Sequence, residues 1–154
     1  MDSTDRQILD LLRSNARLSY AELGRQIGLS PPAVHDRVSK LESTGVILGY
    51  RTLVEPETIG LGVTALVGIV QTDSSEADDI AAELTKLPEV ESCYYLAGQE
   101  SFLCKVRVGT IAQLEVLIGR LNRVPGVART HSTIALSTKW ENRPQPLTDP
   151  DGEQ

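Results

Sequence analysis

The stretch from Ser19 to Gly45 constrains the fold more than any other, because it predicts two helices joined by a tight turn. Ser19, with Glu22 three residues later, has the spacing of a helix capping box. Three side chains give this first helix an apolar stripe: Ala21, Leu23 and Ile27. Gly28 predicts the end of the helix.

The second helix of the pair has a start signal of its own. Ser30 can cap it, and Pro31 suits the first helical position, where the missing N–H of proline costs nothing. Its apolar face consists of Val34, Val38 and Leu41, and its polar residues fall largely on the other faces. This arrangement predicts a helix-turn-helix, in which the second helix enters the DNA major groove. An ordinary helical hairpin is the alternative.

Two further segments complete the predicted DNA-binding domain. Residues 5–15 have apolar side chains at helical spacing, with Ser3 or Thr4 available as a cap, and supply surface that a lone helix pair lacks. The segment VILGYRTLVEP after the pair alternates around Gly49 like a short hairpin closed by Pro56. We therefore expect a wing beside the helices.

DNA contacts are expected from the second helix and the wing tip. The candidates are Ser30, Pro32, Ala33, His35, Asp36, Arg37, Lys40, Tyr50 and Arg51. Arg37 and Lys40 would anchor the helix, and Pro32, Ala33, His35 and Asp36 would face the groove. Arg37 could instead brace the fold, and Tyr50 and Arg51 could lie in a solvated turn.

The net charge of −6 at first argues against a DNA-binding protein. Residues 1–54, however, hold seven Lys/Arg against six Asp/Glu, whereas residues 55–154 hold eight against fifteen. The excess acidity thus lies outside the helix pair. Since non-specific DNA affinity scales with the number of phosphates neutralised, so weakly basic a monomer needs several copies on one DNA. DNA binding would therefore imply an oligomer.

The second half of the chain alternates strands and helices. Its predicted elements are strand, helix, strand, strand, helix and strand, over residues 61–71, 75–87, 90–97, 102–108, 111–121 and 127–138. This βαββαβ order predicts an α+β, ferredoxin-like domain, with four antiparallel strands and both helices on one face. The other face of such a sheet is bare, which favours association with a second copy.

These patterns divide the chain into four parts. We expect a winged helix-turn-helix over residues 1–54, a linker over 55–61, a sensing and oligomerisation domain over 62–140, and a disordered tail over 141–154. No signal peptide precedes Asp2, and the longest apolar run, residues 61–70, is too short to cross a bilayer. We therefore expect a cytoplasmic protein.

The two cysteines, Cys93 and Cys104, are too few for a disulfide framework or a zinc site. They fall on neighbouring strands of one hairpin, opposite each other in one register and two residues apart in another. We expect them reduced and packed as small apolar residues, with no metal and no other cofactor.

Several motifs together resemble the Lrp/AsnC, or feast/famine, family of regulators. They are D..IL..L...AR from Asp5, EL...IGLS from Glu22, the Val34, Arg37, Leu41, Glu42 and Gly45 set, GVILGY from Gly45, LPEVESCY from Leu87, and PGV from Pro125. The likeness covers residues 5–138. It implies a winged helix-turn-helix that binds double-stranded DNA, a linker strand, and a domain that dimerises and senses a small molecule, commonly an amino acid. It also implies that dimers assemble into rings, typically octamers.

The sequence departs from this family in the loop after the second strand of the sensing domain. The family usually has a glycine followed three positions later by aspartate, whereas here Gly98 is followed by Gln99, Glu100 and Ser101. A carboxylate at the usual position could pair with a ligand ammonium, and Ser101 offers only a neutral hydroxyl. The identity of the effector and the response to it are thus open.

The effector site is expected between subunits, formed by this loop and the start of the last strand. The candidates are Leu96, Ala97, Gly98, Gln99, Glu100, Ser101, Phe102, Thr130, His131 and Ser132. Period-two spacing puts Thr130 and Ser132 on one sheet face, where they could bind a ligand carboxylate or lie in water at a sheet edge.

An effector-controlled regulator has three alternatives. An enzyme is disfavoured, because no catalytic triad order, phosphate loop or metal cluster is present and the two histidines fall in different domains. A ligand-binding assembly protein without DNA binding would show no salt-dependent affinity for DNA. A regulator that has lost its effector response would organise DNA constitutively.

Overall fold

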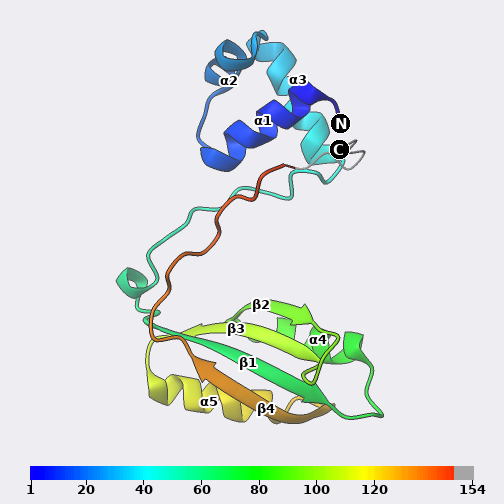
Figure 1. Cartoon of the computed structure of the whole chain (residues 1–154), viewed down its shortest axis with the longest axis vertical. Helices are drawn as coiled ribbons and strands as arrows, with labels where there is room; N and C mark the ends of the chain where they lie inside the picture. Colours follow the sequence, from blue (N-terminus) through cyan, green and yellow to red (C-terminus); the bar gives the residue numbers. More distant parts are fainter. Residues whose placement is uncertain (148–154) are drawn as a thin grey trace. The chain divides into compact units, whose positions relative to one another are not determined.

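A computed structural model describes residues 1–147, which divide into two compact units (Figure 1). The first contains Met1–Thr52 together with residues 140–147, and the second contains Leu53–Lys139. No helix in the described part of the chain combines the length and the apolar character needed to cross a membrane.

The first unit is built on three helices, α1 (Ser3–Ser14), α2 (Tyr20–Ile27) and α3 (Pro31–Ser43). One apolar cluster joins them, formed by Ile8, Leu9, Leu12, Leu23, Val34, Val38 and Leu41. Each helix contributes at least one fully buried side chain to this cluster, so no two of the helices could bury their apolar stripes without the third. The three predicted helices are confirmed.

The helix caps explain where these helices begin. Ser19 and Glu22 form the predicted capping box of α2, and Ser30 accepts a hydrogen bond from the Ala33 N–H at the start of α3. The predicted cap of α1 is wrong: Asp2 caps the helix, in a capping box with Asp5 rather than through Ser3 or Thr4. An aspartate at this position also offsets the positive end of the helix dipole.

The predicted wing is not present. Residues 46–55 contain no strand, and a 3-10 turn, η1 (Glu57–Ile59), follows them. The N–H groups of Val46 and Ile47 both donate to the Leu41 carbonyl, and Gly45 has a left-handed φ of 72°. These bonds hold the chain against the end of α3, and a two-stranded hairpin with no third strand would be only marginally stable.

The second unit is the predicted βαββαβ domain. Its elements are β1 (Val63–Gln71), α4 (Ala77–Thr85), β2 (Val90–Tyr95), β3 (Phe102–Val108), α5 (Ile111–Leu121) and β4 (Val127–Ile134). The strands form one antiparallel sheet in the order β2-β3-β1-β4. The predicted bounds of β3 and α5 match, and the other elements are shorter than predicted by two to four residues at one or both ends.

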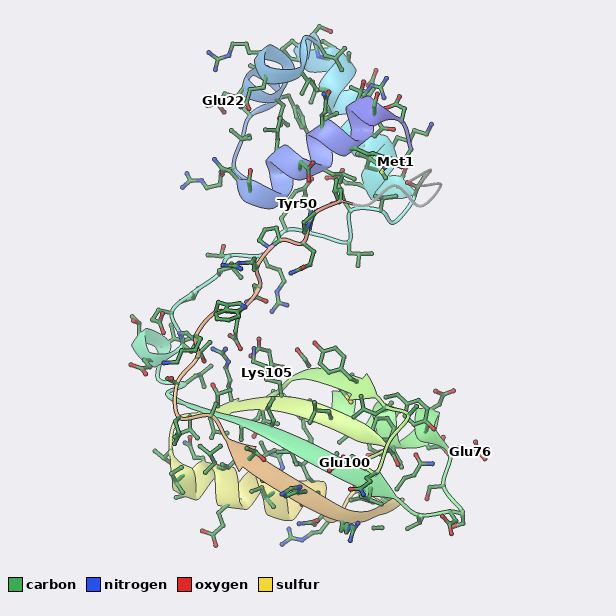
Figure 2. The ribbon with its side chains drawn as sticks, viewed as in Figure 1. Met1, Glu22, Tyr50, Glu76, Glu100 and Lys105 are labelled. Carbon is green, nitrogen blue, oxygen red and sulfur yellow. The ribbon has the colours of Figure 1, made fainter. Side chains whose placement is uncertain are left out.

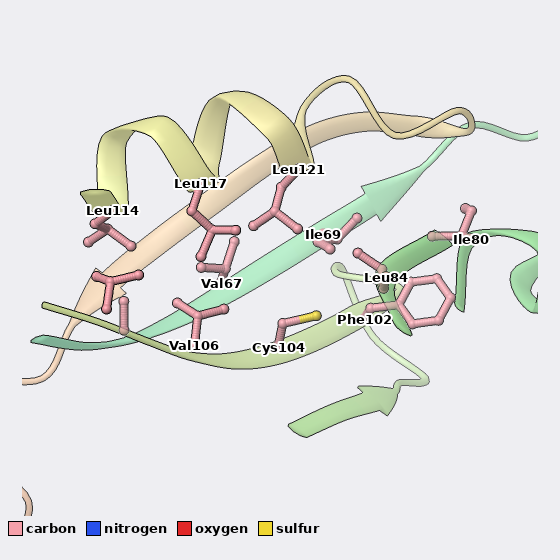
Figure 3. Close-up of a cluster of buried hydrophobic side chains, with 12 residues drawn as sticks. Val67, Ile69, Ile80, Leu84, Phe102, Cys104, Val106, Leu114, Leu117 and Leu121 are labelled. Atoms are coloured by element: carbon pink, nitrogen blue, oxygen red, sulfur yellow. The ribbon is translucent and has the colours of Figure 1, made fainter. Parts of the chain in front are cut away.

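Both helices pack on the same face of this sheet (Figure 3). Leu114, Leu117 and Leu121 of α5 lie over Val67 and Val106, and Ile80 and Leu84 of α4 join the same cluster. Residues on β3 alternate between buried and half-buried, as expected for a strand covered on one side. Of the two cysteines, Cys104 is buried here as predicted, but Cys93 is exposed.

The segment from Glu141 to Leu147 was expected to be disordered, and the structure differs. It contains no helix or strand, but Leu147 packs against the apolar cluster of the three helices, and Arg13 donates a hydrogen bond to the Gln145 carbonyl. The rest of the predicted tail, 148–154, lies outside the described residues.

Candidate DNA-binding and effector sites

Helix α3 presents a polar surface opposite its packed face. Val34, Val38 and Leu41 are at most 4% exposed, whereas Pro32, His35, Asp36 and Lys40 are exposed and Ala33 is half-buried. His35 lies edge-on to Tyr20 of α2, with 5.4 Å between ring centroids, and its Nδ1 is 3.4 Å from Asp36 Oδ1. The Lys40 ammonium has no hydrogen bond or ion pair within residues 1–147.

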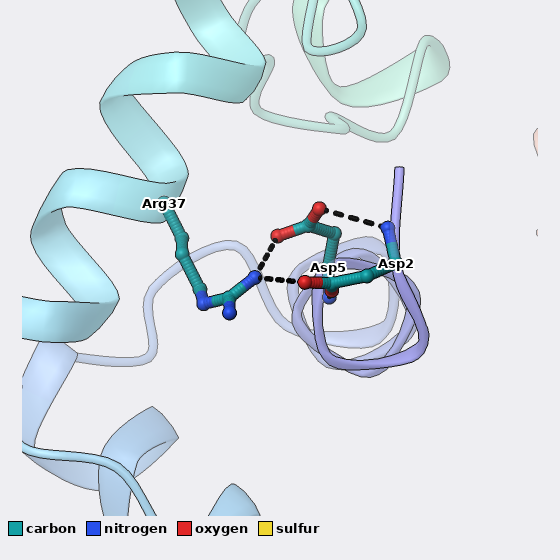
Figure 4. Close-up of polar contacts among 3 residues, drawn as sticks. All are labelled: Asp2, Asp5 and Arg37. Carbon is teal, nitrogen blue, oxygen red and sulfur yellow. Dashed lines mark hydrogen bonds and ion pairs between the residues drawn. The ribbon is translucent and has the colours of Figure 1, made fainter.

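Arg37 braces the fold, as the alternative interpretation of this residue held (Figure 4). Its Nη1 donates to Asp2 Oδ2 at 2.6 Å and to Asp5 Oδ1 at 2.7 Å. The Asp5 N–H and the Arg37 guanidinium, in that order, hold the pKa of Asp2 below its usual value. Arg37 therefore ties α3 to the start of α1, and Lys40 is the basic group that α3 leaves available.

The turn between α2 and α3 depends on Gly24, which the sequence patterns did not single out. Gly24 lies within α2, and its carbonyl oxygen accepts a hydrogen bond from the Leu29 N–H at 2.9 Å. A Cβ at this position would be only 2.3 Å from the Leu29 carbonyl oxygen. The close approach of helix and turn thus requires glycine here.

Tyr50, assigned to the wing tip, lies against α3 instead. Its hydroxyl donates to Glu42 Oε1 at 2.9 Å, and partial burial together with this carboxylate raises the pKa of Tyr50 to about 12. Arg51 is exposed. Both residues belong to the irregular segment after α3, labelled at Tyr50 in Figure 2, so no hairpin presents them to a groove.

In the second unit, the loop from Leu96 to Ser101 closes the hairpin of β2 and β3. The Leu96 N–H donates to the Ser101 carbonyl at 2.8 Å, and the Ser101 N–H donates to the Ile69 carbonyl at 2.7 Å. The Ser101 hydroxyl accepts from the Gln71 N–H. Ser101 thus fixes the loop to β1, while Ala97, Gly98 and Gln99 are exposed.

Glu100 lies across the bare face of the sheet (labelled in Figure 2). Gly68 of β1 makes room for it, because a Cβ on Gly68 would be 2.6 Å from Glu100 Cγ. His131, which pairs with Gly68 in the register of β1 and β4, has its Nδ1 3.8 Å from Glu100 Oε1. Glu100, Gly68 and His131 therefore form a small polar site on the face that no helix covers.

Thr130 and Ser132 lie on the other face, so one chain does not bring the predicted effector residues together. They pair with Ile69 and Val67, whose side chains are buried under the helices, and Thr130 donates to Asn122 Oδ1 at 3.1 Å. The prediction that the two hydroxyls share a face is confirmed. Within one chain Glu100 lies on the opposite face, because successive strand residues point to opposite faces, and the expected pocket between subunits stays a prediction.

Of the other predicted effector residues, Phe102 packs in the core and is not available to a ligand, and Leu96 is half-buried. Phe102 is 2% exposed, and the centroid of its ring lies 5.1 Å from that of the Tyr95 ring.

Within residues 1–147, no group of three or more His, Cys, Asp or Glu side chains is arranged to hold a metal ion.

Comparison with known proteins decides the family. A sequence model of the AsnC-type helix-turn-helix domain matches residues 1–42, and one of the Lrp/AsnC ligand binding domain matches residues 63–145. The chain belongs to the Lrp/AsnC family. As an Lrp/AsnC protein it is a transcriptional regulator with a DNA-binding and a ligand-binding domain, and not an enzyme.

Individual Lrp/AsnC proteins are similar over nearly the whole chain. The HTH-type transcriptional regulator LrpA of Mycobacterium tuberculosis is 41% identical over 143 residues, which are 93% of this chain and 95% of LrpA. A feast or famine regulatory protein from the same organism, solved with L-methionine, has a TM-score of 0.88 at 41% identity, covering 94% of this chain and 97% of that one. A Neisseria meningitidis regulator, also solved with L-methionine, has a TM-score of 0.87 at 30% identity, covering 96% and 97%.

Proposed function

We propose that this regulator reads double-stranded DNA with the exposed face of α3, using Pro32, Ala33, His35 and Asp36 at the groove and Lys40 at a phosphate. The observation that carries the proposal is the division of α3 into a fully buried apolar face and an exposed polar one. Ser30 fixes the start of the helix and Arg37 fixes its position against α1, so both act indirectly. With DNA as partner, the protein acts in the cytoplasm.

A mobility-shift experiment with the DNA upstream of its own gene tests DNA binding. We expect a retarded complex that weakens as salt is raised, because each phosphate contact releases counterions. A ligand-binding assembly protein without DNA binding would leave the DNA unshifted at every salt concentration.

For the effector, we propose an amino acid whose ammonium group pairs with Glu100. The support is the placement of this carboxylate on the bare sheet face, 3.8 Å from His131 Nδ1, and the L-methionine complexes of the two relatives. Glu100 thus takes the part of the aspartate that the family usually has one position later. Backbone groups of Gly98 and Gln99 in the exposed loop complete the site.

A thermal-shift panel of the standard amino acids tests this assignment. We expect at least one to raise the melting temperature of the wild type, since a ligand that binds only the folded state stabilises it. Glu100→Gln should lose that response, whereas Glu83→Gln, which alters a carboxylate on α4, should keep it. If no amino acid gives a shift, the protein is better described as a constitutive DNA-organising regulator.

We also propose that dimers form through the bare sheet face and assemble further, to octamers. Leu66, Tyr94 and Leu103 give this face an apolar surface, and Leu66 is 41% exposed in the single chain. Light scattering of the full chain should give a mass above that of a monomer, and Leu66→Lys should lower it. A monomeric wild type would contradict the proposal.

A further inference from the structure

Cys93 and Cys104 face each other across β2 and β3. They are direct partners in the antiparallel register, and their sulfur atoms are 3.6 Å apart. The Leu96 N–H donates to the Ser101 carbonyl, and since hydrogen-bonded and non-hydrogen-bonded pairs alternate along such a ladder, Cys93 and Cys104 form a non-hydrogen-bonded pair. The Cα atoms of such pairs are about 4.5 Å apart, within the range of roughly 4.4–6.8 Å that a disulfide spans.

The two thiols differ in access. Cys104 is completely buried in the core under the helices, and Cys93 is exposed on the edge strand β2. Burial, with a further contribution from Cys93, raises the pKa of Cys104 to about 12, which keeps its thiol protonated at neutral pH. Because Cys93 shares the helix side of the sheet with Cys104, a partner on the bare face would leave it accessible.

From this arrangement we infer that Cys93 and Cys104 are a reversible thiol-modification site, which low-molecular-weight disulfides such as oxidised glutathione convert to an intramolecular disulfide. The Cys93 thiolate attacks one sulfur of glutathione disulfide, forming a mixed disulfide and releasing one glutathione thiolate. The Cys104 sulfur then attacks Cys93 Sγ, and the second glutathione leaves with the proton of Cys104. The protein loses two electrons and two protons, and glutathione disulfide is reduced to two glutathione molecules.

This disulfide would be labile rather than structural. It would form when the sulfur atoms approach from 3.6 Å to about 2.0 Å, and because it would include the exposed Cys93, it belongs to the more easily reduced class of exposed disulfides. It would also close the hairpin that carries the loop from Leu96 to Ser101.

The test incubates the native full-length protein with oxidised glutathione and follows it by intact-mass spectrometry after alkylation. The wild type should lose both free thiols and end with no glutathione attached, and reduced glutathione should restore both. Cys104→Ala should stop with one glutathione on Cys93, and Cys93→Ala should stay unmodified while folded, because Cys104 is shielded.

Three results would overturn the inference. They are a wild type that keeps glutathione on Cys93 beside a free Cys104, a wild type that does not react, and a disulfide that links two chains on a non-reducing gel. Should Cys104→Ala not fold, Cys104→Val fills the same buried position with an apolar side chain, and peptide mapping of the oxidised wild type locates the bond directly.

Discussion

Arg37 Nη1 lies 2.7 Å from Asp5 Oδ1, an ion pair that joins the third helix of the DNA-binding unit to the first. The Asp5 side chain is only 16% exposed, so it depends on this partner more than a surface carboxylate would. The pair thus fixes where α3 stands relative to α1.

We expect Arg37→Ala to lower the melting temperature of the protein, because it leaves Asp5 half-buried without its cation. A thermal melt followed by circular dichroism measures the change. The double variant Asp5→Ala, Arg37→Ala should lower the melting temperature by less than the sum of the two single changes. Lys40→Ala is the control and should leave the melting temperature unchanged, because the Lys40 side chain has no partner in the described chain. Additive effects of Asp5→Ala and Arg37→Ala would show that the pair does not stabilise the fold.

Acid should weaken the DNA-binding unit first. The pKa values of Asp2 and Glu22 lie below their usual range, chiefly because the backbone N–H groups of Asp5 and Ser19 donate to their carboxylates. Their charged forms are therefore favoured by folding, so this stability is fully present above about pH 4.3 and is lost as the pH falls further. Denaturant unfolding at a series of pH values measures the effect. The free energy of unfolding of the Asp2→Asn, Glu22→Gln double variant should depend less steeply on pH than that of the wild type. The same pH profile for both proteins would contradict the assignment.

Gly24 and Gly119 offer a matched pair of helical glycines. A Cβ on Gly24 meets the Leu29 carbonyl oxygen at 2.3 Å, whereas one on Gly119 meets only the tip of Arg123 at 4.0 Å. We expect Gly24→Ala to lower the free energy of unfolding by roughly 1–3 kcal/mol through overpacking. Gly119→Ala should raise it by about 0.4–1 kcal/mol through backbone entropy. Denaturant titration measures both, and equal effects would contradict the role of Gly24 in the turn.

Gly68 should matter for effector binding more than for folding. Gly68→Ala would push Glu100 away, at little cost because Glu100 is a flexible side chain. The thermal shift given by an active amino acid should therefore shrink, as with Glu100→Gln. Gly62→Ala, whose Cβ meets only Glu57 Cγ at 3.9 Å, is the control and should respond like the wild type. A full response of Gly68→Ala would remove Glu100 from the site.

The sequence was sufficient where structure is determined locally. The caps at Ser19 and Ser30, the end of α2 at Gly28 and the strand at residues 102–108 depend on neighbours a few positions away, and each is found as predicted. The prediction of a wing around Gly49 was wrong. A two-stranded hairpin is stable only when a third strand or a helix packs against it, and the periodicity of one segment does not show whether such a partner exists.

The sequence was insufficient where residues that are far apart in the chain come into contact. The partner of Arg37 is at the chain start, and nothing near Arg37 indicates that Asp2 and Asp5 lie beside it. Period-two spacing placed Thr130 and Ser132 on one face, but only the register of β1 with β4 shows that Glu100 is on the other. For the cysteines the sequence left two registers open, and the register of β2 with β3 makes Cys93 and Cys104 direct partners.

The central claim, that α3 binds DNA through its exposed face, is tested most directly by the salt dependence of DNA affinity. Fluorescence anisotropy with labelled DNA from upstream of the gene would compare the wild type with Lys40→Ala and with Arg123→Ala, which removes an exposed cation in the turn after α5. We predict that the logarithm of affinity falls linearly with the logarithm of salt concentration, with a slope shallower by about one for Lys40→Ala and unchanged for Arg123→Ala. The same affinity and slope for a folded Lys40→Ala as for the wild type would contradict the claim.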